Sequence, residues 1–332
     1  MGMKGFKGFE KDFSYGGKQY EENTTYEEHG VGCCHKGVMH FCEDPWEVLK
    51  HYDLVDGNGN FSEFAEVEAL GQVWNDGEKR ATNKIHVGAK LGLEGFLKAC
   101  IDFTLEKTKY ESNGTNLPGN YAKIGSSGDS AQIGSSGYSA QIGSSGDYAK
   151  IGSSGYYAQI GSSGYYAQIG SSGDSAKIGS SGDSAQIGSS GDSAKIGSSG
   201  YSAKIGSSGD SAQIGSSGYS AQIGSSGNSA KIGSSGDSAK IGSSGDYAKI
   251  GSSGDYAKIN STGEDAVIMC AGSRSKAKGK KGSWITLAEW VKDEEKGRYV
   301  PVCVKTERVD GEKIKEDTYY TMKNGEFVEV EE

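Results

Sequence analysis

The stretch that decides the fold reads Gly188-Ser189-Ser190-Gly191-Asp192-Ser193-Ala194-Lys195-Ile196, one copy of a nine-residue unit that fills residues 120–268. The Ala-x-Ile triplet occurs sixteen times at this spacing, from Ala122–Ile124 to Ala257–Ile259, and a degenerate copy follows at Ala266–Ile268. A short fixed period is typical of a solenoid, in which each repeat packs only on its neighbours.

Each unit predicts one short strand and one turn. Ala and Ile stand two residues apart with Lys or Gln between them, so Ala and Ile share one face of a strand and Lys or Gln occupies the other. The Gly-Ser-Ser-Gly segment is expected to form the turn, because Gly accepts a positive φ and Ser bonds to nearby backbone. A helix is excluded, since two Gly in every nine residues would cost it roughly 2 kcal/mol per repeat.

The coil size follows from the reach of the chain. Nine extended residues span at most ~32 Å, which is too short to close around Ile side chains. Two units close a flat coil with one strand on each side, as in nonapeptide and hexapeptide β-helices. At ~4.8 Å per coil, about eight coils give a rod roughly 38 Å long. We therefore predict a mainly β protein built on a two-sided right-handed parallel β-solenoid of about 18 residues per coil.

An 18-residue coil predicts ladders of side chains on the outside of the rod. Stacked aromatic pairs contribute ~0.5–1.5 kcal/mol each, so such a ladder either stabilises a rod with a small core or forms a binding surface. Copy-to-copy differences lie at outward positions, where partner contacts are expected. The tyrosines predicted to stack are Tyr138 on Tyr156, Tyr148 on Tyr166, and Tyr201 on Tyr219.

Two specific roles for the repeat, calcium binding and mimicry of nucleic acid, fit its residues poorly. The calcium-binding nonapeptide has Asp two residues before the buried apolar residue, and this sequence has Ala there. The nine Lys of the Ala-Lys-Ile triplets balance the nine Asp of the repeats, so the rod is nearly neutral and does not resemble an acidic mimic of nucleic acid.

Composition and charge divide the chain into three parts. The net charge is −9, and residues 1–111 carry 20 Asp and Glu against 13 Lys and Arg. This acidity disfavours nucleic acid as a partner. We predict an α+β head over residues 1–111, a solenoid over 112–272 and a β cap over 273–332. With no long apolar run, no signal-peptide core and six unevenly spaced Cys, we expect a cytoplasmic protein with no membrane partner.

The head contains recognisable helix and strand signals. Asp44 is placed to cap a helix that starts at Pro45 and ends near Tyr52. The Asp56-Gly57-Asn58-Gly59-Asn60 stretch imitates the start of a calcium-binding EF-hand loop, but Phe61 stands where Gly is required, so a turn is expected. Two strands are predicted, one over 65–69 with Ala65, Val67 and Ala69 inward, and one over 84–87. A helix is predicted over 91–105, with Leu93, Phe96, Leu97 and Cys100 inward.

A cluster of thiols and imidazoles is the candidate metal site. Thiolates and imidazoles are the ligands that zinc prefers, although a C-x-x-C pair is missing here. The alternative is small buried Cys beside a polar His on a strand, and we expect no metal and no cofactor. The candidate ligands are Cys33, Cys34, His35, His40 and Cys42.

A basic loop follows the repeats. It offers either a phosphate site, though without the order of a Walker motif, or a solvated turn at the end of the rod. Beyond it, strands over 283–290 and 299–307 and a hairpin around Lys323-Asn324-Gly325 predict an antiparallel sheet that covers the last coil. The basic residues are Arg274, Lys276, Lys278, Lys280 and Lys281.

The head resembles the ADP-ribosyltransferase core in two short motifs. Gly37-Val38-Met39-His40-Phe41, followed by a helix ending at Tyr52, is similar to that family's Gly-x-[Tyr/His]-Phe strand and its helix ending in Tyr. Glu66-Val67-Glu68 is similar to its Glu-x-Glu loop, although it comes sooner after the tyrosine. The resemblance implies an enzyme or nucleotide binder in which His40, Tyr52, Glu66 and Glu68 are catalytic, with Glu68 polarising the nicotinamide ribose. The alternative for Glu66 and Glu68 is the solvated face of a strand.

The whole arrangement resembles uncharacterised repeat proteins of phages and prophage-bearing bacteria. The resemblance rests on a head of the Gly-His-Phe-Cys type and on an ending that begins at Val309 and reads V-D-G-x-x-I-K-x-D-T-x-Y. It implies a phage-encoded protein with a head, nonapeptide repeats and a cap. We expect a non-enzymatic rigid scaffold whose Tyr, Lys and Asp ladders bind a host protein rather than nucleic acid. A self-assembling structural protein, a homo-oligomer through the head or a rod end, is the other alternative.

Overall fold

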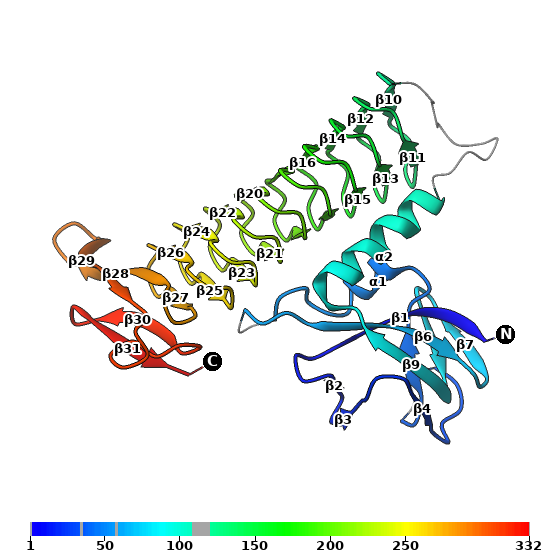
Figure 1. Ribbon diagram of the computed structural model, residues 1–332, viewed down its shortest axis with the longest axis horizontal. Helices are drawn as coiled ribbons and strands as arrows, with labels where there is room; N and C mark the ends of the chain where they lie inside the picture. Colours follow the sequence, from blue (N-terminus) through cyan, green and yellow to red (C-terminus); the bar gives the residue numbers. More distant parts are fainter. Residues whose placement is uncertain (1, 34–35, 57–58, 108–119, 332) are drawn as a thin grey trace.

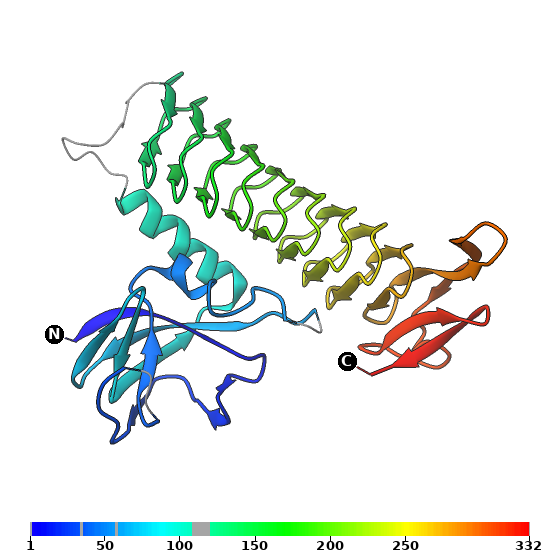
Figure 2. The same ribbon diagram turned by 180° about the vertical axis from the view of Figure 1, so that it is seen from behind.

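A computed structural model describes residues 2–33, 36–56, 59–107 and 120–331 of the chain. Figure 1 shows a long solenoid with a head packed along one of its sides and a cap at its C-terminal end. Figure 2, seen from behind, shows the same arrangement, with helix α2 (Gly92–Lys107) lying along the solenoid. The predicted mainly β architecture of head, solenoid and cap is confirmed.

The solenoid consists of two parallel sheets. One contains the even-numbered strands β10 (Lys123–Ser126), β12 (Gln141–Ser144), β14 (Gln159–Ser162), β16 (Lys177–Ser180), β18 (Lys195–Ser198), β20 (Gln213–Ser216), β22 (Lys231–Ser234), β24 (Lys249–Ser252) and β26 (Val267–Cys270). The other contains the odd-numbered strands β11 (Gln132–Ser135), β13 (Lys150–Ser153), β15 (Gln168–Ser171), β17 (Gln186–Ser189), β19 (Lys204–Ser207), β21 (Gln222–Ser225), β23 (Lys240–Ser243), β25 (Lys258–Ser261) and β27 (Lys276–Lys278).

Successive rungs of each sheet pair with an offset of 18 residues. Lys195 lies beside Lys177 on one side and Gln213 on the other, and the odd-numbered sheet has the same register. The predicted coil is therefore confirmed. There are about nine coils instead of eight, because the degenerate copy forms β26 and residues 276–278 form one further rung, β27.

Ile and Ala fill the interior of the solenoid. Every described Ile of the repeats is at most 5% exposed, and the Ile of the two sheets form a single continuous core. Because the coil is thin, this core is one Ile layer per sheet with Ala at the turns. Burial of each Ile side chain stabilises the rod by roughly 1.5–3 kcal/mol.

The turns differ from the prediction in one respect: the positive φ belongs to the sixth residue of the unit and to none of its described glycines. Ser193, for example, has φ 57°. The second Gly of Gly-Ser-Ser-Gly is required for close approach instead. A Cβ added to Gly200 would lie 2.1 Å from the carbonyl oxygen of Gly182 in the preceding coil. A larger residue there would force the coils apart.

Copies with Asp and copies with Tyr at the fifth position satisfy the backbone of the turn in different ways, although the copy with Tyr165 keeps the positive φ of the Asp copies, 56° at Tyr166. In Asp copies the carboxylate accepts a hydrogen bond from the next coil, as when Asp210 N–H donates to Asp192 Oδ1 at 2.9 Å. In the copies with Tyr138 or Tyr201 the following residue lacks the positive φ, and a backbone bond replaces the carboxylate; Ser220 N–H donates to Tyr201 O at 2.9 Å. Part of the copy-to-copy variation thus satisfies the rod's own backbone, and a role of these positions in partner contacts stays a prediction.

The head is built on a four-stranded antiparallel sheet in the order β1-β6-β9-β4, accompanied by a three-stranded sheet in the order β5-β8-β7. Its strands are β1 (Met3–Phe9), β2 (Ser14–Tyr15), β3 (Lys18–Gln19), β4 (Thr24–Glu27), β5 (Met39–Phe41), β6 (Glu63–Ala69), β7 (Val73–Asp76), β8 (Lys79–Thr82) and β9 (Lys84–Lys90). The predicted alternation over 65–69 is confirmed, since Ala65, Val67 and Ala69 are buried.

Both predicted helices of the head are present. Helix α1 (Pro45–Val48) is shorter than expected; beyond it the chain continues to Tyr52 in turns bonded mainly from residue i to residue i−3. Asp44 caps it as predicted, accepting from Trp46 N–H at 2.9 Å. Helix α2 buries its Leu93, Phe96, Leu97 and Cys100, also as predicted. Because α2 contacts β6 on one side and β13 to β19 on the other, it joins the head to the solenoid.

The cap continues the last coil of the solenoid. β28 (Trp284–Asp293) starts in parallel beside β26 and then pairs with β29 (Arg298–Arg308). β30 (Tyr319–Lys323) joins β27 and forms a hairpin with β31 (Glu326–Val330). Each solenoid sheet therefore ends in an antiparallel hairpin at its C-terminal edge, as predicted.

Candidate functional site: the open face of the solenoid

The two sides of the solenoid have the same sequence pattern but different surroundings. The outward residues of the odd-numbered strands, here called the covered face, are largely buried; all four residues of β17 are buried. The outward residues of the even-numbered strands, here called the open face, are exposed; in β16 and β18 both Lys and Gly are exposed. The head causes this difference, because it packs on one side only (Figures 1 and 2).

On the covered face the head places large apolar side chains over the row of glycines. A Cβ added to Gly188 would lie 3.1 Å from Trp46 Cη2, and one added to Gly206 would lie 2.7 Å from Leu97 Cδ2. Phe61 lies in the same way over Gly224, 2.9 Å from an added Cβ. The absence of side chains on these strands thus creates a shallow trough that accepts aromatic and aliphatic groups.

Carboxylates of the head pair with the Lys and Gln row of the same face. Asp53 accepts from Gln222 Nε2 at 2.8 Å and forms ion pairs with Lys204 at 3.4 Å and Lys240 at 3.2 Å. Burial raises the pKa of Asp53, but Gln222 and the two lysines outweigh it, so the net pKa lies below the ordinary value. Lys150 pairs with Asp44 in the same way.

One contact between the head and the covered face coincides with a departure from the repeat. Asn260 stands where other copies have Gly, and its amide donates to Gly59 O of the head at 2.8 Å. Residues 57 and 58 of the stretch that imitates an EF-hand start lie outside the described residues. On its described side, Asn60 O accepts from Asp56 N–H, which closes the expected turn.

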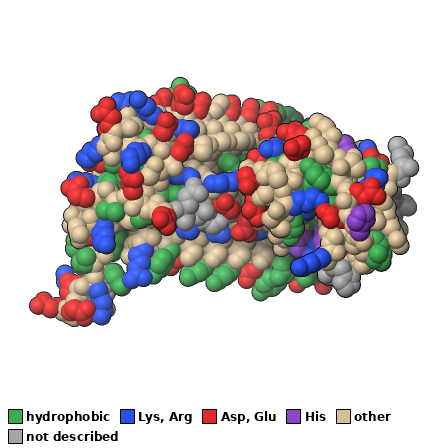
Figure 3. Space-filling view, turned by 90° about the horizontal axis from the view of Figure 1, so that it is seen from below, with side chains coloured by type: hydrophobic (Ala, Val, Ile, Leu, Met, Phe, Trp, Pro, Cys, Tyr) green, Lys and Arg blue, Asp and Glu red, His purple; other side chains and the backbone are tan. Residues whose placement is uncertain are grey.

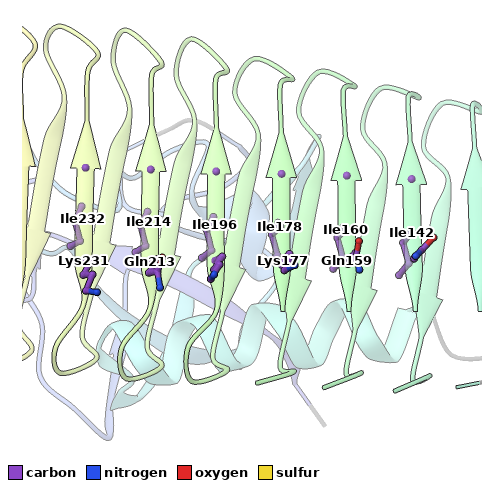
Figure 4. Close-up of a pocket in the computed structure, with 18 of the residues that line it drawn as sticks. Ile142, Gln159, Ile160, Lys177, Ile178, Ile196, Gln213, Ile214, Lys231 and Ile232 are labelled. Atoms are coloured by element: carbon purple, nitrogen blue, oxygen red, sulfur yellow. The ribbon is translucent and has the colours of Figure 1, made fainter. Parts of the chain in front are cut away.

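The open face presents the same two rows without a cover. Together they line a groove of about 1260 Å³ that runs over successive strands from Lys123 to Lys249. Figure 4 shows the labelled Gln and Lys side chains at matching positions on neighbouring strands, with the Ile side chains beside them. A Cβ added to any glycine of the row would meet no atom within 4 Å. The glycines are Gly125, Gly143, Gly161, Gly179, Gly197, Gly215, Gly233 and Gly251.

The groove is positively charged. Its polar row consists of lysines and glutamines and includes no acidic residue. In the described part of the chain, no ion pair involves the lysines of this row, whereas those of the covered face meet Asp44 and Asp53. The row consists of Lys123, Gln141, Gln159, Lys177, Lys195, Gln213, Lys231 and Lys249. The arrangement can bind a group that brings carboxylates and apolar side chains together.

The three predicted tyrosine stacks are present at the turns. The ring centroids are 5.6 Å apart for Tyr138 and Tyr156, and 5.2 Å apart both for Tyr148 with Tyr166 and for Tyr201 with Tyr219. The rings of each pair lie within 12° of parallel. These stacks stabilise neighbouring coils, and a binding role for them stays a prediction.

The four residues of the ADP-ribosyltransferase resemblance do not share one pocket. His40 and Tyr52 line a pocket of about 140 Å³, and Glu66 and Glu68 line another of about 410 Å³. The register explains the separation, because Glu66 lies opposite Phe6 on the sheet, whereas the neighbouring residue Lys7 lies opposite Ala65 on the other face. An active site built from all four residues is therefore not assembled here.

The candidate zinc ligands are dispersed where they are described. Cys33 Sγ donates to Asn75 O at 2.9 Å, and Cys42 is buried beside β1. Cys34 and His35 lie outside the described residues. Within residues 2–33, 36–56, 59–107 and 120–331, no three His, Cys, Asp or Glu side chains come close enough to hold a metal ion.

The basic loop is part turn and part strand: Arg274 and Lys281 are exposed in turns, as expected, whereas residues 276–278 form a strand. Lys276 and Lys278 belong to β27, and each has its Nζ 4.7 Å from the ring centroid of Tyr319. Lys280 pairs with Asp317 at 2.7 Å, and Arg274 donates to Tyr256 Oη at 2.8 Å. The fifth residue, Lys281, lies beside Gly311. These basic groups stabilise the junction of solenoid and cap.

Sequence reasoning missed the residues that distinguish the two faces. Glycines of both faces stand in identical copies, so no signal within the repeat tells which row is covered. Asn260 was a usable signal, since it interrupts the glycine row where the rod meets Gly59 of the head. A second omission is Lys7, whose isolation from acidic groups depends on the packing of distant segments.

Neither helix of the described chain combines the length and apolar character needed to cross a bilayer.

Comparisons with known proteins cover the head alone. The search of curated proteins finds no match, and neither does the search of solved structures. Residues 3–99 match a family model described as a domain of unknown function (DUF7666), so the head is similar to the domains of that family.

Proposed function

We propose that this protein is a non-enzymatic binding scaffold whose open face docks an acidic segment of another protein. The observation that carries the proposal is that one strand pattern, [Lys/Gln]-Ile-Gly-Ser, is covered by the head on one side and exposed on the other. The docked head serves as an example of what this surface accepts.

The chemistry of the docked head defines the partner. It brings aromatic and aliphatic side chains to the glycine row and carboxylates to the lysine row. We infer that the partner carries a segment in which Asp or Glu alternates with large apolar residues, for example one side of an amphipathic helix. Such a segment would follow the groove along several coils, each ~4.8 Å apart.

A second copy of this chain is a poor occupant. Two open faces placed together would bring like-charged lysine rows into contact. The docking surface of a second head is already used, because Trp46 and Leu97 are buried against the covered face of their own chain. Growth through the C-terminal end of the rod is opposed by the hairpins of the cap. The resemblance to phage repeat proteins suggests that the partner is a bacterial host protein.

The side of the molecule that carries the head and the cap shows no comparable strip among its described residues. Figure 3 shows acidic and basic side chains interspersed over the side of the molecule that carries the head and the cap. Charges arranged in this way favour solubility more than one extended contact. The open face differs, because its charges have one sign and follow one line.

Binding of a fluorescent random copolymer of glutamate and tyrosine tests the proposal, since it supplies carboxylates and aromatic rings in a single chain. We expect binding at low salt that weakens as salt increases. Replacing Lys177, Lys195 and Lys231 by Gln, which the repeat itself uses at this position, should weaken binding about tenfold, at roughly 0.5 kcal/mol per exposed pair.

The matched control removes three lysines elsewhere. Lys98, Lys292 and Lys296 are exposed and lie on α2 and in the cap, so their replacement by Gln lowers the net charge equally and should leave binding unchanged. Equal losses in the two triple variants would contradict a groove-specific site. Preference for oligothymidine or for polyglutamate over the mixed copolymer would also contradict it, because neither supplies an acidic polypeptide with aromatic side chains.

A further inference from the structure

A buried lysine in the head has no carboxylate partner among the residues that the structure describes. Lys7 on β1 is 1% exposed, and its Nζ donates to His40 O at 3.2 Å and lies 3.3 Å from Tyr52 Oη. The titratable groups that act on it are Cys42 and Lys18, and no described carboxylate is among them. A lysine is rarely this buried unless it is paired.

Aromatic rings surround the amine. Its Nζ lies 4.4 Å from the ring centroid of Tyr15 and 5.4 Å from that of Phe9, and Tyr20 and Tyr52 each lie at 5.8 Å. These rings replace water without supplying a countercharge. Burial therefore lowers the pKa of Lys7 to about 7. At neutral pH, Lys7 is then a free amine in about half of the molecules.

The amine faces a cavity large enough for a small molecule. The cavity has a volume of about 140 Å³, and cavities of about 150 Å³ admit a benzene-sized guest. Tyr15, at its edge, is 43% exposed, so the cavity lies near the surface. The lining residues are Phe6, Lys7, Tyr15, His40, Phe41, Cys42, Val48, His51, Tyr52 and Lys79.

The other polar groups of this cavity are neutral except for one. Burial lowers the pKa of His40 and of His51, and Lys79 lowers both further. Burial also raises the pKa of Tyr52 far above its ordinary value, so its hydroxyl keeps its proton and can donate a hydrogen bond. His40 Nε2 is buried and lies 3.9 Å from Asp76 Oδ2, beyond hydrogen-bond distance. Lys79 is the cation of the group.

We propose that Lys7 is the reactive amine of a site for small carbonyl compounds that carry a carboxylate, such as 2-oxo acids. Lys79 supplies the positive charge for the carboxylate, and Tyr52 stands beside the reacting nitrogen. This site lies in the head, away from the open face, and is independent of the docking function proposed above.

The reaction balances without an oxidant or reductant. The Nζ lone pair attacks the carbonyl carbon to form a C–N bond, while the electrons of the C=O π bond move to the oxygen. A proton passes from nitrogen to that oxygen, with the Tyr52 hydroxyl placed to donate a hydrogen bond to it. The nitrogen lone pair then forms the C=N bond as the C–O bond breaks, and the hydroxyl takes the remaining nitrogen proton and leaves as water, so that a neutral imine remains on Lys7.

Reductive trapping of glyoxylate on the full-length protein tests the proposal. Borohydride added after incubation at pH 7 converts the imine to a stable amine, and peptide mass spectrometry locates it. An ordinary lysine with a pKa of about 10.4 has a roughly 10³-fold smaller fraction of free amine at this pH than one at about 7. We expect Lys7 to be labelled at least about tenfold faster than any other lysine, with a rate that reaches a plateau above pH 7.

Two variants make the result specific. Lys7→Met fills the same space without the amine and should lose the preferred label, whereas Lys4→Met, an exposed position on the same strand, should keep it. Lys79→Gln should reduce labelling by glyoxylate severalfold and leave labelling by propionaldehyde unchanged.

Other outcomes overturn the proposal. If lysines are labelled in proportion to their exposure and Lys7 is spared, the site does not exist. If formaldehyde with borohydride modifies Lys7 but glyoxylate does not, or if Lys79→Gln has no effect, the assigned ligand class is wrong. Thermal unfolding of each variant shows whether a lost label reflects a lost fold.

Discussion

At the scale of single residues, two positions carry charges whose environment determines their role. Lys7 is buried away from water, and no described carboxylate shifts its pKa. Asp192 accepts a backbone hydrogen bond from the next coil. The repeat pattern identified the outward position of Asp but not its bond, because the bond depends on the turn conformation. The burial of Lys7 could not be predicted from the sequence, since a lysine in a Gly- and Phe-rich strand is ordinarily exposed.

Lys7 should make the stability of the head depend on pH in an unusual direction. Its pKa is about 7 when folded and 10.5 in the unfolded reference, so between these values the unfolded chain binds more protons and stability rises with pH. At about 1.36 kcal/mol per pKa unit, this rise reaches roughly 4 kcal/mol. Lys7→Met should be more stable than the wild type at pH 7, and this advantage should disappear by about pH 10.5. Urea unfolding of both proteins across this range measures the difference, and a constant difference would refute the assignment.

The Asp ladder predicts a small and specific loss of stability. Asp192→Ala removes the acceptor for Asp210 N–H and should cost about 0.5–1.5 kcal/mol in unfolding free energy. Asp192→Asn is the matched control, because Asn228 performs the same role for Asp246 N–H at 2.9 Å. Denaturant titration should place the Asn variant within about 0.5 kcal/mol of the wild type. Equal losses in the two variants would show that charge, not the hydrogen bond, matters at this position.

At the scale of strands and helices, strands with the same sequence pattern are covered by the head on one side of the solenoid and exposed on the other. β17 and β18 are both [Lys/Gln]-Ile-Gly-Ser, yet Gly188 lies under Trp46 and Gly197 faces open space. The sequence was sufficient to predict the strands, their register and the helix α2, because these follow from local periodicity. It could not predict which face the head covers, since that choice depends on packing between segments that are distant in sequence.

Substitution of these two glycines should therefore have opposite effects. Gly188→Val forces a side chain against the buried Trp46 ring and should cost about 1–3 kcal/mol, whereas Gly197→Val should be neutral or stabilise the strand by about 0.5–1 kcal/mol. Thermal unfolding compares the stabilities, and hydrogen exchange in α2 reports on the docked head. Similar losses at both positions would show that the two faces do not differ in the way described.

At the scale of the whole molecule, the solenoid is a core of its own with a head placed on one side. Its Ile layers are internal, so its fold does not depend on apolar surface supplied by the head. The three-part division and the C-terminal cap were predictable from composition and period. The contact between head and rod was not, because each of its members, such as Asp53 and Lys240, is unremarkable in its own segment.

Removal of residues 1–111 should convert the covered face into a second open face. The glutamate–tyrosine copolymer should then bind at two strips instead of one, and its binding capacity per rod should about double. Analytical ultracentrifugation of the complex at saturation measures this stoichiometry. An unchanged stoichiometry, with the rod shown to be folded by circular dichroism, would mean that the two faces are not equivalent surfaces.

The most direct test of the open face as a docking surface is lysine footprinting by acetylation, with and without the copolymer. In the free protein we expect Lys177, Lys195 and Lys231 to react readily, and Lys150, Lys204 and Lys240 to be protected by the carboxylates of the head. Bound copolymer should protect the first group and leave the second unchanged. Protection that falls elsewhere, or exposure of the second group as the head is displaced, would contradict the account.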